Sequence, residues 1–218
     1  RAIVFGLSLS VKLLPIIFLH LLWNYFRNKE GLKLQKLALY YLTVGAIVII
    51  TFLPFLSSEV VSNFSNSLGL WFQKFEFNAS IYYLIRWIGF EIKGYNIIAT
   101  VGKILPIIVI LIILGLAFFR RNQNLQNLIV SMLLGITAYF FFSTTVHPWY
   151  LATPLLLSVF SNLRYMILWS GLIFLSYFAY SSPEVEENFW LLAVQYLAVS
   201  GYLLYEVLQK KASAPAYE

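Results

Sequence analysis

Long apolar segments, separated by short polar ones, dominate the pattern of residues along this chain. Segments of roughly 18–25 apolar residues recur, and a helix of that length crosses a hydrocarbon core of about 30 Å. The segments are continuously apolar instead of alternating, which favours helices over the strands of a membrane barrel. We therefore expect one all-α domain over residues 1–218, a polytopic transmembrane helical bundle. Its spans, about seven in number, are expected at 4–26, 37–56, 97–119, 127–146, 149–163, 165–181 and 189–208.

The composition supports a membrane protein and narrows its chemistry. The chain is 61% hydrophobic and 11% charged, with a mean hydropathy of +0.79, which is too apolar for a soluble domain of 218 residues. It has no cysteine, which excludes disulfides and thiolate metal sites, and no motif predicts a metal or a cofactor. It also has no aspartate and begins with Arg1. We therefore expect it to be the C-terminal part of a longer protein.

Basic residues follow every second apolar segment. They are Arg27, Lys29, Lys33, Lys36, Arg120, Arg121, Arg164, Lys210 and Lys211. The loop at 181–188 is acidic and the turn at 144–148 is uncharged, so the positive-inside rule places the basic loops in the cytoplasm and the other two outside. The net charge of +6 then belongs mostly to cytoplasmic loops, and we predict no nucleic-acid partner. We expect a multi-pass integral membrane protein, in a bacterial inner membrane rather than the endoplasmic reticulum.

One expected external segment, residues 57–96, is long. It mixes aromatic and charged side chains, a composition typical of the membrane–water interface. We expect one or two interfacial helices here, broken near 75–80. The segment would either shape a substrate site or only anchor the protein at the lipid surface.

The sequence TVHPWYLATP, which begins at Thr145, carries one of the two histidines. Pro148 suits the first turn of a helix and biases His147 towards an extended backbone. Trp149 and Tyr150 are amphipathic and suit the membrane interface. We expect the His147 ring to open into an external pocket, where it could donate to an anionic oxygen such as a phosphate. The alternative is an interfacial cap, with His147 bonded to a loop carbonyl.

Two lysines begin the similar sequences KLLPII and KILPII. Lys12 lies 15 residues before Arg27 and Lys103 lies 17 before Arg120, which is roughly 22 and 26 Å along a helix. Both amines are therefore expected slightly below the outer interface. They could converge with His147 on one lipid phosphate, or they could simply snorkel to the headgroups.

The sequence FEFNASIYYLIR, residues 75–86, groups Glu76, Asn78, Ser80 and Arg86. Carboxylate, amide and guanidinium groups suit sugar hydroxyls and phosphates. Ser80 is also placed to cap a helix that begins beside it.

Three pieces of the chain, taken in order, resemble the C-terminal half of a GT-C glycosyltransferase. They are GLSLSVKLLPIIFLHLLW, FEFNASIYYLIR and HPWYLATPLLL, and the family most similar is that of the polyprenol-phosphate-mannose-dependent mannosyltransferases. The resemblance implies a membrane hexosyltransferase whose site opens to the extracytoplasmic side. It implies a polyprenyl-phosphate sugar donor and a lipid- or protein-linked acceptor as partners. His147 would face the donor phosphate, and Asn78, Ser80 and Arg86 would shape the site.

The same resemblance places the essential carboxylate early, on a first external loop that this chain does not match. No catalytic residue is therefore assigned within 1–218. Two other functions stay open: a non-catalytic membrane subunit that scaffolds a larger complex, and a transporter of a lipid-linked sugar. A transporter should show more polar or broken spans near mid-bilayer, so we rank it last.

Overall fold

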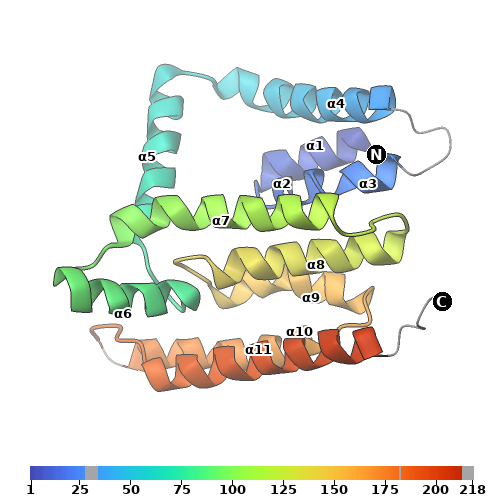
Figure 1. Ribbon diagram of the computed structural model, residues 1–218. Coiled ribbons are helices and arrows are strands. Elements are labelled where there is room, and N and C mark those ends of the chain that lie inside the picture. Colours follow the sequence, from blue (N-terminus) through green and yellow to red (C-terminus); the bar gives the residue numbers. More distant parts are fainter. Residues whose placement is uncertain (28–33, 182, 213–218) are drawn as a thin grey trace.

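The computed structural model describes residues 1–27, 34–181 and 183–212, and their regular elements are all helical (Figure 1). In chain order they are α1 (Ala2–Val11), α2 (Ile16–Leu19), α3 (Leu22–Arg27), α4 (Leu34–Phe52), η1 (Leu53–Phe55), α5 (Ser58–Lys74), α6 (Ile81–Lys93), α7 (Ile98–Phe118), α8 (Leu125–Phe141), η2 (Pro148–Leu151), α9 (Ala152–Val159), α10 (Tyr165–Leu172), η3 (Ile173–Ser181) and α11 (Phe189–Ala212). The α labels are α-helices and the η labels are 3₁₀ helices.

Three of these segments are long and apolar enough to cross a bilayer: Leu34–Phe55, Ile98–Phe118 and Phe189–Gln209. The helical elements of the described residues confirm the all-α class, and these three segments are consistent with a membrane protein, but they do not confirm seven spans. The other expected spans are built from shorter helices. The expected span 149–163 consists of η2 and α9, and 165–181 consists of α10 and η3.

The N-terminal segment is a helical hairpin, and the single span expected over 4–26 is wrong. α1 ends directly before Lys12, whose backbone is extended (φ −152°, ψ 129°). Phe5 and Phe26 both pack on Tyr40, with ring centroids 6.2 and 5.3 Å from it. In one continuous helix the two phenylalanines would lie about 31 Å apart. The chain therefore reverses direction at Lys12, which lies at the tip of the hairpin.

The helices that follow run back and forth, so that alternate loops meet at the same end of the bundle (Figure 1). At one end the Asn24 side chain donates to the carbonyls of Ala117 and Arg120, at 2.6 and 3.0 Å, and Glu206 accepts from the backbone N–H of Arg164 at 2.7 Å. These contacts gather the basic loops, as the charge pattern predicts. Lys29 and Lys33 lie outside the described residues.

The core lies where α8, α10 and α11 meet the α2–α3 arm of the hairpin. Trp169, Leu133 and Met166 have no exposed surface there. Large apolar side chains stay exposed along the outer faces of the long helices, for example Leu42 and Leu111. Such a belt suits a helix bundle solvated by lipid.

The break expected near 75–80 is observed between α5 and α6. α5 runs across the direction of its neighbours in Figure 1, and Ser57 caps it by accepting from the Val60 N–H at 3.2 Å. α6 has 13 residues and ends at Gly94, in the left-handed region at φ 74°. At about 20 Å it is too short to cross a bilayer. Its interfacial position remains a prediction.

Candidate functional site

A short backbone junction brings two of the predicted motifs together. The Phe77 N–H donates to the Thr144 carbonyl at 3.0 Å, and the Val146 N–H donates to the Phe77 carbonyl at 2.9 Å. Thr145 Oγ1 also donates to the Phe75 carbonyl at 3.1 Å. The loop before α6 therefore lies against the loop before η2, at the end of the bundle opposite the basic loops.

Asn78 is the centre of this junction. It is fully buried and left-handed at φ 48°, a conformation that asparagine tolerates better than most residues. Its Nδ2 donates to the Val146 carbonyl at 3.1 Å, and its Oδ1 accepts from Gln195 at 3.2 Å. The Tyr196 hydroxyl donates to its carbonyl at 2.6 Å. Asn78 therefore joins three segments of the chain and presents no surface to a ligand.

Glu76 and Arg86 form an ion pair beside the junction, with Oε1 and Nη1 2.6 Å apart. The Tyr82 hydroxyl donates to Glu76 Oε2 at 2.6 Å. The Arg86 guanidinium also lies over two rings, 4.7 Å from the centroid of Tyr83 and 5.4 Å from that of Phe189. Both members of the pair keep about a quarter of their side-chain surface exposed, 25% for Glu76 and 22% for Arg86. The pair can therefore meet a ligand without first breaking apart.

Ser80 is the N-cap residue of α6, but its side chain makes no capping bond, so the predicted cap is wrong. The backbone there (φ −105°, ψ −97°) does not aim the hydroxyl at the helix N–H groups. The hydroxyl instead borders the groove described below.

Glu187 is a site residue that the sequence reasoning missed. It accepts from the Asn78 N–H at 2.5 Å and from the Tyr83 hydroxyl. Burial raises the pKa of Glu187 and also that of the Tyr83 hydroxyl, because each would ionise in a poorly solvated place. In the sequence, the acidic charge of the loop at 181–188 indicates only on which side of the membrane the loop lies. Its contact with residues about a hundred positions earlier has no signature in the sequence.

His147 has the extended backbone expected before a proline, at φ −81° and ψ 150°. Its ring stacks on Trp149, with centroids 4.4 Å apart and planes 9° apart, and on Phe77 at 5.1 Å. Trp71 of α5 adds a third ring at 6.0 Å. Partial burial lowers the pKa of His147, which favours the neutral imidazole. The ring is partly buried against three aromatic side chains and does not line the groove between α6 and α11, so the expectation that it opens into that kind of pocket is corrected.

The Nδ1 atom of His147 is buried and has no hydrogen-bond partner among the described residues. The predicted alternative, a bond to a loop carbonyl, is therefore not observed. An unsatisfied buried polar atom is costly.

Lys12 reaches the same place from the hairpin tip. Its Nζ lies 5.3 Å from the centroid of Tyr150, and Tyr150 contacts the His147 ring edge to face at 5.3 Å. Lys103 is exposed on α7 and makes none of these contacts within the described part of the chain. Lys12 and His147 therefore both lie against Tyr150, whereas Lys103 does not, and their convergence on one group stays a prediction.

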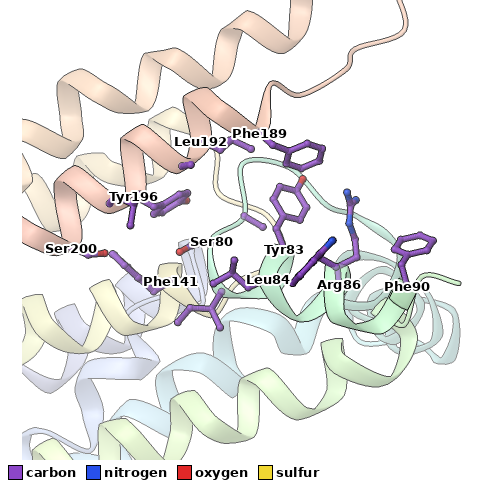
Figure 2. A pocket seen from close by; sticks show the side chains of 15 residues that line it. Ser80, Tyr83, Leu84, Arg86, Phe90, Phe141, Phe189, Leu192, Tyr196 and Ser200 are labelled. Carbon is purple, nitrogen blue, oxygen red and sulfur yellow. The ribbon is translucent and has the colours of Figure 1, made fainter. Parts of the chain in front are cut away.

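A groove of about 710 Å³ lies between α6 and α11 (Figure 2). Its polar lining includes Ser80, Tyr83 and Arg86 near one end and Ser200 at the other, and its apolar lining includes Phe141 of α8 and Leu192 of α11. The volume lies within the usual range for small-molecule sites. His147 and Lys12 do not line it. The groove is therefore distinct from the region around Tyr150.

The described residues contain no group of three or more side chains suited to a metal ion. Comparisons of the chain with family models, with curated proteins and with solved structures find no match.

Proposed function

We propose that this chain is part of a membrane glycosyltransferase that uses a polyprenyl-phosphate sugar donor, in which the sugar is mannose or another hexose. The observation that carries the proposal is that Lys12 and His147 both lie against the ring of Tyr150. A lysine ammonium and an imidazole beside the same ring suit one anionic oxygen group. No ion pair joins Lys12 to a carboxylate among the described residues, so its charge is available.

The groove on α6, which Lys12 and His147 do not line, suits the hydroxyl groups of an acceptor. Glu76, Ser80 and Arg86 supply donors and acceptors for hydroxyl groups, and Asn78 fixes the loops that carry them. Trp149 is exposed next to His147, where it suits the membrane interface. The site would open to the extracytoplasmic side of a bacterial inner membrane, because the basic loops gather at the opposite end.

A second function, a non-catalytic subunit that scaffolds a membrane complex, is favoured by a different observation. Both carboxylates at the site are already engaged, Glu76 by Arg86 and Glu187 by Tyr83. Neither is placed as a free base. A catalytic carboxylate would have to come from another part of the protein or from a partner.

The test is Lys12→Met in the full-length protein, with Lys103→Met as the matched control. Binding of decaprenyl phosphate is measured in phosphatidylcholine nanodiscs. Loss of a charge-assisted contact worth about 1.5–3 kcal/mol weakens binding roughly 10- to 100-fold, whereas the control keeps its affinity. Equal affinities in the two variants and the wild type would show that Lys12 only anchors its hairpin.

A further inference from the structure

The groove between α6 and α11 has the length of one membrane leaflet. Its lining on α11 runs from Phe189 to Ser200, a distance of about 16 Å at 1.5 Å per residue. The hydrocarbon core of a bilayer is about 30 Å thick. The groove therefore begins at the end of the bundle with the acidic loop and extends about halfway through the core.

The walls of the groove suit a hydrocarbon chain that enters sideways from the bilayer. Small side chains, Ala79 and Ala193, leave its space open. Leu84, Trp87 and Leu197 border it and are each about two thirds exposed or more, at 65%, 65% and 73%. A lipid chain could pass between these exposed side chains without crossing a polar barrier.

Apart from Ser200, the polar groups lie at or beside the outer end of the groove, where two carboxyl groups accompany one guanidinium. Arg86 is paired with Glu76, and its neighbour Tyr83 is bonded to a second carboxylate, Glu187. One guanidinium therefore faces two carboxyl groups, which disfavours a further anion. Lys12 and His147, in contrast, carry no carboxylate contact among the described residues.

We propose that this groove binds an outer-leaflet lipid with an uncharged, hydroxyl-rich headgroup, such as a glycosyl diacylglycerol. One acyl chain of the lipid occupies the groove, and the headgroup hydroxyls accept hydrogen bonds from Arg86 and exchange them with Ser80, both of which line it. This is a second lipid site, separate from the anion site at Lys12 and His147. Its role as the acceptor site rests on the proposed function; the binding itself does not.

The test uses the full-length protein in phosphatidylcholine nanodiscs and two photoreactive probes. Both carry the same diazirine-labelled acyl chain, one on a glucosyl diacylglycerol and one on phosphatidylglycerol. Cross-linked peptides are located by mass spectrometry. We expect the glucosyl probe to label peptides of α6 and α11 about tenfold more than the anionic probe does.

Ala193→Trp fills the groove, and we expect it to reduce this labelling about tenfold. Ala198→Trp is the control, because Ala198 lies on the same helix, is exposed and does not line the groove. Labelling that is equal for the two probes, spread evenly around the bundle, or unchanged in Ala193→Trp would overturn the inference. The comparison of the two probes needs only the wild-type protein, so it tests the inference even if a variant misfolds.

Decaprenyl phosphate binding by the same variants separates the two proposals. If Ala193→Trp keeps that binding and loses the glucosyl labelling, the sites are distinct as we infer. If Ala193→Trp loses both decaprenyl phosphate binding and glucosyl labelling, the groove belongs to the donor site and the inference of a second site is wrong. If wild type takes the glucosyl probe but not decaprenyl phosphate, the proposed function fails and the groove assignment stands.

Discussion

Gly102→Ala should destabilise the protein by opening the crossing of α5 over α7. A Cβ atom at Gly102 would lie 1.9 Å from the carbonyl oxygen of Phe72 and 3.0 Å from its carbonyl carbon. Ordinary contact begins at 3.4 Å, so the α5 backbone must move by 1.5 Å. The obstacle is backbone and not the end of a flexible side chain, so no rotamer change relieves it. Overpacking of this kind costs typically about 1–3 kcal/mol.

Thermal unfolding of the full-length protein in detergent measures this effect. A loss of about 2 kcal/mol lowers Tm by roughly 4–8 °C for a domain of this size. Gly115→Ala is the matched control, because it makes the same change in the same helix with no atom within 4 Å of the new Cβ. It should keep or slightly raise Tm, since alanine favours a helix over glycine. A Tm for Gly102→Ala equal to that of the control would refute the close approach of α5 and α7.

Three further predictions concern the junction. Burial raises the pKa of Glu187, so the folded state binds the carboxyl proton more tightly than the unfolded state does. The free energy of unfolding should therefore fall as the pH rises from the ordinary carboxyl pKa of 4.5 through the raised value. In Glu187→Gln, unfolding measured over the same pH range should no longer show this fall. Asn78→Ala leaves a left-handed alanine and strips the partners of the side chain, so we expect a loss of about 2–4 kcal/mol in the free energy of unfolding, against no change for the exposed Asn66→Ala. A cysteine at position 147 should react with a membrane-impermeant maleimide in intact cells, and labelling only after permeabilisation would reverse the assigned topology.

Some of the site could be predicted because its residues are close together in the sequence. Glu76 and Arg86 are ten positions apart, and a helix that begins after Ser80 brings them to one place, so their pairing follows from local structure. Glu187 and Gln195 could not be predicted in the same way. Glu187 lies in the loop before α11 and Gln195 lies on α11, and both reach Asn78 only through the tertiary fold, which has no local signal in the sequence.

The sequence by itself determined the helical class, the long apolar helices and the gathering of basic loops at one end. These follow from the length of each apolar segment and the placement of charge, which are local properties. Only the tertiary structure decided that the first apolar segment turns back at Lys12. The segment is apolar on both sides of that residue, so its composition does not reveal the reversal.

The tertiary structure also decided which of the candidate groups meet. Lys12 and Lys103 begin nearly identical sequences and have similar calculated depths, yet only Lys12 contacts Tyr150. Depth along a helix follows from counting residues, whereas the direction of a side chain around the bundle depends on which faces pack together. The groove between α6 and α11 has the same origin, since it exists only where two helices distant in the sequence leave small residues facing each other.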